Sequence, residues 1–276
     1  MTGASEWVTV RVFPGSHRDA VPPALFAAGA QSIQELADSF VTHVHGQSMA
    51  NDVVCAMTAL GADVRVETEP TPDIDWSEQW KQSLGIQELG GLTVSPPWRA
   101  GELDPARTVV IDPGMAFGTG DHATTRGVIR LLQKLVRPGD VVADLGAGSA
   151  VLAIAAAKLG AARVAAIESD PDAIGNATDN VARNGVVDRV TVIEGDAATL
   201  LPLVAPVDVI TANIISSVLV ELLPAMRAAL APGGHAILSG ILSAERDAML
   251  SAISRDWRVV DEDSEDVWWS TTIALR

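Results

Sequence analysis

The chain has 276 residues, which is enough for one large domain or for two, and its 19 Lys and Arg against 35 Asp and Glu give a formal net charge of −16. That charge argues against a protein that grips nucleic acid, because phosphate binding needs a basic patch, and it suits either a basic partner or solubility alone. No apolar run approaches the roughly 20 residues of a membrane span, and the first residues lack the pattern of a signal peptide, so we expect a cytoplasmic protein without membrane attachment.

Residues 1–69 have the pattern of a small α+β domain. Strands are expected at residues 7–12, 32–36, 40–44 and 64–68, and helices at residues 22–28 and 53–60. This β-α-β-β-α-β order is the ferredoxin-like arrangement. His43 and His45 alternate along one predicted strand with no cysteine nearby. The spacing favours exposed strand residues over a metal pair, and no metal site is expected.

Cys55 is the single cysteine, which excludes an intrachain disulfide and is compatible with a reducing cytoplasm. Its neighbours Val53, Val54, Ala56 and Met57 are apolar. Because a free thiol in such surroundings behaves as a small hydrophobic side chain, we expect Cys55 to be buried.

Residues 70–106 have the composition of a linker and connector. Residues 69–73, E-P-T-P-D, combine prolines and acids with nothing to bury. A short helix capped by Asp75 is expected to follow. Residues 93–98 and 108–111 then have an extended pattern.

Residues 112–125, D-P-G-M-A-F-G-T-G-D-H-A-T-T, place three glycines and several hydroxyls directly before a predicted helix at residues 126–136. Helix capping accounts for Thr124 or Thr125. It accounts less well for the apolar Phe117 in so flexible a stretch. We therefore expect a mobile lid in which Phe117 covers a bound ligand.

The stretch from residue 141 to 170 is the centre of the chain. An apolar strand ends in Asp144, Gly146 and Gly148 bracket a tight turn, a helical pattern follows, and a second apolar strand ends in Glu168. Strand, glycine turn, helix and strand form a βαβ unit with a right-handed crossover.

The chemistry of this unit points to a nucleoside ligand. Glycines let the backbone approach a ligand closely, and the helix N-terminus offers N–H groups to an anion. Glu168 lies 22 positions after Gly146, close to the roughly 20-residue spacing at which an acid binds ribose hydroxyls. A nicotinamide-dependent oxidoreductase is one alternative, but Val151 stands where its fingerprint needs glycine. The D-x-G-x-G turn that begins at Asp144 resembles the first motif of class I S-adenosylmethionine (AdoMet) methyltransferases.

The remaining residues continue an open α/β sheet. Strands are expected at residues 190–193, 207–212 and 236–238, with a closing antiparallel pair at residues 258–260 and 268–275. Asn213 follows directly at the carboxyl end of a central strand, where ligands bind in such sheets. Trp268 and Trp269 point to opposite faces of the last strand, so one is expected in the core and the other near the site.

Several motifs together resemble the bacterial ribosomal protein L-eleven methyltransferase (PrmA) family. They are the lid sequence, D-L-G-A-G-S-A-V-L at residues 144–152, D-N-V-A-R-N-G-V at 179–186, A-N-I at 212–214, P-G-G at 232–234 and L-S-G-I-L at 238–242. The resemblance covers nearly the whole chain and is weakest across the N-terminal domain. Asp121, Ala147 and Ala150 depart from the family's usual Thr, Cys and Gly.

The resemblance implies a class I methyltransferase domain with a Rossmann-like sheet at residues 107–276. Because residues 1–69 carry no cofactor motif and precede the proline-rich linker, we expect them to form a ferredoxin-like substrate-recognition domain. The resemblance also implies AdoMet as cofactor and ribosomal protein L-eleven, a basic protein, as substrate, methylated on lysine side chains and on the N-terminal amine. The cofactor-binding residues that we expect are Phe117, Gly118, Thr125, Asp144, Gly146, Gly148, Glu168, Asp196 and Asn213. Thr125 would contact the methionine part. Asp196 would accept a hydrogen bond from the adenine amino group, or would only cap the following helix.

Asn213 is the candidate catalytic residue. A sulfonium methyl is already activated, so the protein must supply in-line geometry and a neutral amine. Lysine has an unperturbed pKa of about 10.4, so desolvation and oxygen acceptors must favour the neutral form. The Asn213 side-chain oxygen would orient that amine; the alternative is a residue that merely ends a strand. His122 is expected to order the lid rather than to act as a base.

Two further alternatives stay open at this point. A catalytically silent cofactor-binding module is one, for which Ala150 is the only indication. A lysine methyltransferase with a different protein target is the other.

Overall fold

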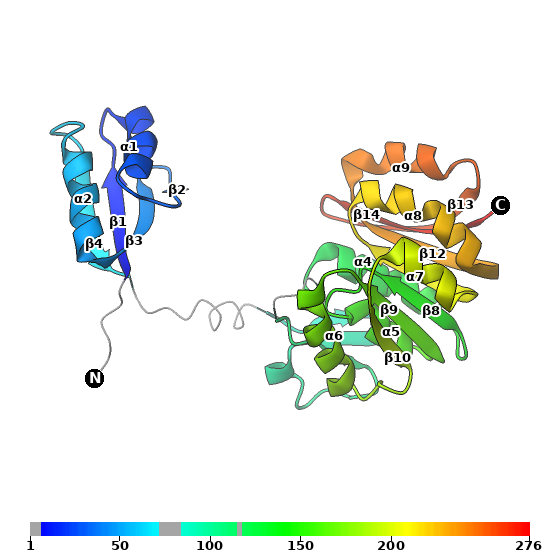
Figure 1. Ribbon diagram of the computed structural model, residues 1–276. Helices are drawn as coiled ribbons and strands as arrows, with labels where there is room; N and C mark the ends of the chain where they lie inside the picture. Colours follow the sequence, from blue (N-terminus) through cyan, green and yellow to red (C-terminus); the bar gives the residue numbers. More distant parts are fainter. Residues whose placement is uncertain (1–6, 72–83, 115–117) are drawn as a thin grey trace. The chain divides into compact units, whose positions relative to one another are not determined.

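The computed structural model describes residues 7–71, 84–114 and 118–276 (Figure 1). The chain divides into two compact units, Met1–Ser83 and Leu84–Arg276. The short helix expected after Asp75 and the position of Phe117 lie outside the described residues. Within those residues, no helix is long and apolar enough to cross a membrane.

The N-terminal unit has the ferredoxin-like arrangement that the sequence predicts. Its elements are β1 (Trp7–Phe13), α1 (Val21–Ala27), β2 (Gln34–Glu35), β3 (Phe40–His45), α2 (Gly46–Thr58) and β4 (Arg65–Pro70), with a 3-10 turn at Arg18–Ala20. The strands pair in the antiparallel order β2-β3-β1-β4. Val8, Val10 and Val12 alternate along β1 and pack against buried residues of α1 and α2. Burying a valine side chain in this way stabilises a fold by about 1.5–3 kcal/mol.

Two details of the N-terminal unit differ from expectation. Cys55 is exposed, so the prediction of a buried thiol is wrong. On α2 the inward positions are Val53 and Met57, four residues apart, and a residue midway between them points to the opposite side. Pro70 belongs to β4, where it pairs with Val8, instead of starting the linker. β4 is an edge strand, which tolerates a proline. His43 and His45 are exposed strand residues, as predicted.

The C-terminal unit begins with a small mixed sheet of order β5-β6-β7, formed by Gln87–Leu89, Leu92–Ser95 and Thr108–Val110. The extended stretch expected at residues 93–98 is interrupted, since Pro97–Arg99 forms a 3-10 turn. Leu89, Val94 and Val109 are buried in the same cluster as the central helices. The connector residues from Leu84 onward therefore pack as part of this unit.

The larger sheet has the order β10-β9-β8-β11-β12-β14-β13. Its strands are β8 (Val141–Leu145), β9 (Arg163–Glu168), β10 (Val190–Glu194), β11 (Val207–Asn213), β12 (Leu230–Leu242), β13 (Trp257–Glu265) and β14 (Trp268–Leu275). β10 to β12 run parallel, and β14 and β13 close the sheet with antiparallel pairing. The predicted closing pair is confirmed. The winding reverses between β8 and β11, which is where open α/β sheets bind ligands.

Helices cover both faces of this sheet (Figure 1). They are α4 (Ala123–Leu135), α5 (Val151–Lys158), α6 (Pro171–Arg183), α7 (Ala197–Val204), α8 (Ser216–Ala229) and α9 (Arg246–Ile253). Val142 and Val164 face the α4, α5 and α6 side. Ala143 and Leu145 face the α7, α8 and α9 side. Parallel strands buried on both faces read as nearly continuous apolar runs, and in residues 141–145, V-V-A-D-L, Asp144 alone interrupts the run.

Candidate active site

A cavity of about 600 Å³ opens at the carboxyl ends of β8, β9 and β11. It is lined by His122, Thr124, Gly146, Gly148, Ile167, Glu168, Ser169, Gly195, Asp196, Ala197, Asn213, Ile214, Ile215, Val218, Leu222, Gly240 and Trp268. Five predicted site residues meet there, namely Gly146, Gly148, Glu168, Asp196 and Asn213. Of these five, Gly146 and Asn213 lie 67 positions apart in the sequence, yet they share one concave surface.

The turn after β8 requires its glycines. Gly146 and Gly148 adopt φ values of 69° and 52°, in the left-handed region. A Cβ at Gly146 would lie 2.5 Å from Cγ2 of Ile214, a residue of the cavity wall. Ala150 also has a positive φ, 64°. An alanine in this region is strained by about 1–2 kcal/mol relative to a right-handed conformation, a cost that a glycine would not carry.

Glu168 is 8% exposed and ends β9 beside this turn. Its Oε2 accepts a hydrogen bond from the Gly148 N–H at 2.8 Å, and its Oε1 accepts one from the Asp170 N–H at 2.8 Å. Each carboxylate oxygen retains a further lone pair. The backbone therefore fixes the carboxylate while leaving it able to accept hydrogen bonds from a ligand.

Asp144 lies behind the cavity and does not line it. Its side chain is 1% exposed; Oδ1 accepts from the Thr211 hydroxyl at 2.7 Å and Oδ2 from the Ala153 N–H at 3.1 Å. Burial raises the pKa of this carboxyl to about 6, against the lowering effect of the two hydrogen bonds. Asp144 thus ties β8 to β11 and to the first turn of α5.

The structure confirms the capping role of Asp196, and the adenine-binding role stays a prediction. Its Oδ1 caps α7 by accepting from the Thr199 N–H at 2.9 Å and from the Thr199 hydroxyl at 2.8 Å. The residue also lines the cavity. A capping role and a ligand-binding role are compatible, because a carboxylate has a second oxygen.

Asn213 is the last residue of β11, and its backbone pairs in register with Ser239 of β12. Its side chain lines the cavity, and no other described residue forms a hydrogen bond with its amide. Gly240 of β12 packs against the backbone of Ile214, the residue after Asn213. A Cβ at Gly240 would lie 2.4 Å from the Ile214 carbonyl oxygen. The tight contact between these two strand ends explains the glycine of the L-S-G-I-L motif.

Another part of the wall comes from His122, Thr124 and Trp268. His122 caps α4, with Nδ1 2.8 Å from the Thr124 hydroxyl and within 3.4 Å of its N–H. The expectation that Thr124 or Thr125 caps this helix is therefore wrong, because both residues lie inside it. The His122 and Trp268 rings meet edge to face at 5.0 Å between centroids. Trp269 is 1% exposed, so Trp268 is the tryptophan near the site.

Other predicted site residues lie outside the lining. Thr125 is fully buried, and its hydroxyl has no hydrogen-bond partner among the described residues. The carbonyl oxygen of Gly118 accepts a hydrogen bond from the Ser149 hydroxyl at 2.6 Å. Conversely, sequence analysis did not single out Ile215, Val218 and Leu222. Their signal was the apolar i, i+3, i+7 spacing directly after Asn213.

The electrostatics of the cavity suit a cationic ligand. Glu168 and Asp196 contribute carboxylates, and none of the described lining residues is Lys or Arg. Ile214, Ile215, Val218 and Trp268 make the remainder apolar. Such a surface both attracts a positive charge and removes water from a group that enters.

Comparison with known proteins gives a consistent result. A family model described as ribosomal protein L11 methyltransferase (PrmA) matches residues 26–275. A ribosomal protein L11 methyltransferase of Pelotomaculum thermopropionicum is 40% identical over 218 residues, covering 78% of this chain and 70% of the relative. One of Symbiobacterium thermophilum is 42% identical over 214 residues, covering 73% and 66%. The match thus spans about two thirds of the length of these relatives.

One solved structure agrees with this assignment. A ribosomal protein L11 methylase from Lactobacillus delbrueckii subsp. bulgaricus superposes with a TM-score of 0.62 at 29% identity, covering 70% of this chain and all of the other. The family model matches well over half of the chain. This chain belongs to the ribosomal protein L11 methyltransferase (PrmA) family.

Proposed function

We propose that this protein transfers methyl groups from AdoMet to amino groups of ribosomal protein L11, on lysine side chains and on the N-terminal amine. The observation that carries the proposal is the convergence of Gly146, Gly148, Glu168, Asp196 and Asn213 on one cavity in a chain of this family. The net charge of −16 is consistent with a basic protein substrate and not with direct binding to nucleic acid.

The residues present fit AdoMet. The turn at Gly146 has no room for a Cβ and exposes its backbone at the cavity, and Glu168 has free lone pairs for ribose hydroxyls. The buried hydroxyl of Thr125, next to the lining residue Thr124, lacks a partner among the described residues and would serve the methionine part. When bound, AdoMet supplies a methyl group already activated on a sulfonium centre.

The remaining chemistry belongs to the acceptor amine. An ammonium cannot attack, so the amine must lose a proton, and the apolar side chains of Ile214, Ile215 and Trp268 favour the neutral form by desolvation. The Asn213 amide oxygen would hold the remaining amine hydrogens and aim the lone pair. An uncharged acceptor suits this role, since a carboxylate would stabilise the ammonium. The released proton passes to solvent at the mouth of the cavity.

The two units suggest a division of labour. The cofactor motifs all lie beyond Leu84, whereas the ferredoxin-like unit has none. We therefore assign substrate recognition to the N-terminal unit and place the protein in the cytoplasm, where its substrate is made.

A lysine methyltransferase with a different protein target would use the same cavity. The two targets can be separated by incubating the enzyme with methyl-labelled AdoMet and a complete set of large-subunit ribosomal proteins from cells that lack the enzyme. Label confined to L11 is the expected result. If another protein is labelled and L11 is not, the proposed substrate is wrong, while methyl transfer from AdoMet to a protein is still supported.

A further inference from the structure

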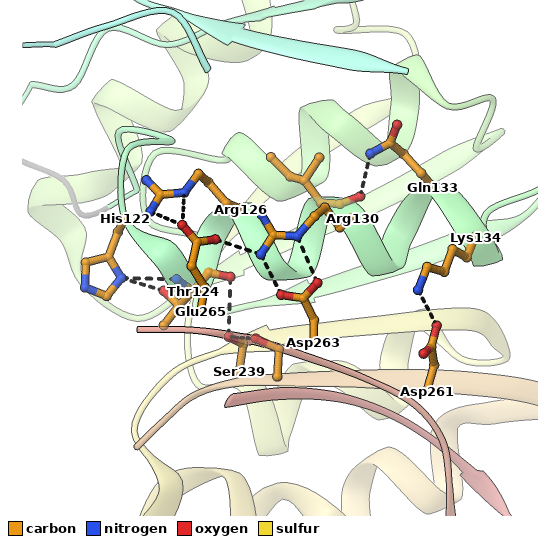
Figure 2. A network of polar contacts seen from close by, with 12 residues as sticks. His122, Thr124, Arg126, Arg130, Gln133, Lys134, Ser239, Asp261, Asp263 and Glu265 are labelled. Carbon is orange, nitrogen blue, oxygen red and sulfur yellow. Dashed lines mark hydrogen bonds and ion pairs between the residues drawn. The ribbon is translucent and has the colours of Figure 1, made fainter. Parts of the chain in front are cut away.

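A ladder of ion pairs joins α4 to the edge strand β13 (Figure 2). Arg126, Arg130 and Lys134 recur at four-residue intervals on one face of α4, and Asp261, Asp263 and Glu265 alternate along one face of β13. Figure 2 shows these side chains pointing toward each other from the helix and the strand. The ladder lies outside the cavity, since none of its members lines it.

The ladder is tightest at the end nearest the cavity. Arg126 donates from Nε (2.9 Å) and Nη2 (2.5 Å) to Oε1 of Glu265. Arg130 donates to both oxygens of Asp263, at 2.8 and 2.5 Å, and to Oε2 of Glu265 at 2.7 Å. Arg126 and Glu265 are 17% and 29% exposed, whereas Lys134 and Asp261 at the far end are 56% and 37% exposed. Hydrogen bonds from Arg126 hold the pKa of Glu265 below its usual range.

Both partners of the inner pair connect directly to the cavity wall. Arg126 Nη1 also donates to the backbone carbonyl of Asp121, the residue before His122. Glu265 is three residues before Trp268, across the turn in which Asp266 adopts a φ of 53°. His122 and Trp268 are the lining residues whose rings meet at 5.0 Å. The pair therefore bridges the two segments that deliver these rings.

Near the inner ion pair, α4 also packs closely against the hairpin that β13 and β14 form. A Cβ at Gly127 would lie 2.8 Å from the Ser270 hydroxyl and 3.2 Å from Oδ1 of Asp263. The Ser239 hydroxyl lies 2.7 Å from that of Ser270 and contacts the Thr124 carbonyl oxygen at 3.4 Å. With so little free space, a change in the inner ion pair is transmitted to the wall instead of being absorbed locally.

From this geometry we infer that Arg126 and Glu265 are positioning residues, which set the binding of the cofactor by holding His122 and Trp268 in place. The inference rests on the proposed function for the identity of the ligand. Neither side chain lines the cavity, so each acts through the ring that it anchors. Lys134 and Asp261 belong to the same ladder, at 2.7 Å, but have no such connection to the wall.

The test uses the full-length protein and S-adenosylhomocysteine, the demethylated form of the cofactor, as a binding probe in calorimetry. Arg126→Met should weaken its binding about tenfold, and Glu265→Gln should weaken it in the same direction. Lys134→Met, the matched control at the far rung, should change the affinity less than twofold. Melting temperatures of all variants show whether each remains folded at the temperature of the titration.

A second arm separates positioning from a general structural effect. Trp268→Ala removes the ring that the ion pair is inferred to hold against His122. In this background, adding Arg126→Met should therefore weaken binding of the probe by less than a further twofold. An equal effect of Arg126→Met and Lys134→Met, or a full tenfold loss in the Trp268→Ala background, would overturn the inference. If Arg126→Met does not fold, Glu265→Gln carries the same comparison. Failure of the wild-type protein to bind the probe would instead refute the proposed function.

Discussion

Asp144 is a buried carboxyl whose charge should lower the stability of the protein at neutral pH. Burial raises its pKa from the ordinary 3.8 to about 6. Between these two values the folded protein binds more protons than the unfolded chain, so stability falls as pH rises through this range and levels off above pH 6. At about 1.4 kcal/mol for each pH unit, the full penalty is on the order of 3 kcal/mol.

Asp144→Asn removes this charge and keeps the shape. The amide oxygen can accept from the Ala153 N–H, and the amide nitrogen can donate to the Thr211 hydroxyl, which rotates to accept. The variant should therefore be more stable than the wild type at pH 7.5, by up to about 3 kcal/mol, and roughly half of this advantage should be lost at pH 5.

Urea unfolding of both proteins at several pH values between 5 and 7.5 measures this difference directly. Asp188→Asn serves as the matched control, because the Asp188 side chain is 72% exposed and this variant makes the same substitution outside the core. A stability difference for Asp144→Asn that does not change with pH, or a variant less stable than the wild type at pH 7.5, would refute the reasoning.

Three further predictions concern the cavity and the division of labour. Glu168→Gln should weaken AdoMet binding tenfold or more, because charge-assisted hydrogen bonds contribute roughly 1.5–3 kcal/mol each, and unchanged affinity in calorimetry would remove Glu168 from the site. Asn213→Ala should lower kcat on the order of 100-fold with little effect on AdoMet affinity. Asn213→Asp should be similarly slow near neutral pH but recover partly as pH rises. If Asn213→Ala keeps the single-turnover rate of the wild type, Asn213 has no catalytic role and merely ends a strand. A fragment of residues 84–276 should bind AdoMet yet fail to methylate L11, and full activity of that fragment would contradict substrate recognition by the N-terminal unit.

The sheet of the C-terminal unit could be predicted because its signals are local. The D-x-G-x-G turn, the buried strands and the acid at Glu168 each follow from a few neighbouring residues, and their order implies the winding. Alternation along β14 predicted that Trp268 and Trp269 face opposite ways. It could not say which faces the cavity, since that depends on where β14 pairs with β12.

Three predictions about local structure were wrong because they were made from neighbouring residues alone, whereas the outcome depends on how each element packs or pairs. Cys55 has apolar residues on both sides, but on α2 the buried positions are four residues apart and Cys55 lies between them. The cap of α4 was placed at a threonine because hydroxyls are common caps, whereas the ring nitrogen of His122 accepts the hydrogen bond. Pro70 was assigned to the linker, although an edge strand leaves room for it.

The ion-pair ladder could not be predicted at all. The basic residues of α4 recur at helical spacing, which by itself indicates only a solvated face. Their acidic partners lie 127 to 139 residues further along the chain, for Lys134 with Asp261 and for Arg126 with Glu265. Nothing in the sequence pairs these segments, and only the packing of α4 against β13 brings them together.

The most direct test of the central claim is intact-protein mass spectrometry of purified L11 after incubation with this protein and AdoMet. The wild-type protein should add whole methyl increments to L11, located by fragmentation on lysine side chains or on the N-terminal amine, and Asn213→Ala should add far fewer in the same time. An unmodified L11 in the presence of wild-type protein that binds AdoMet would contradict the proposed function.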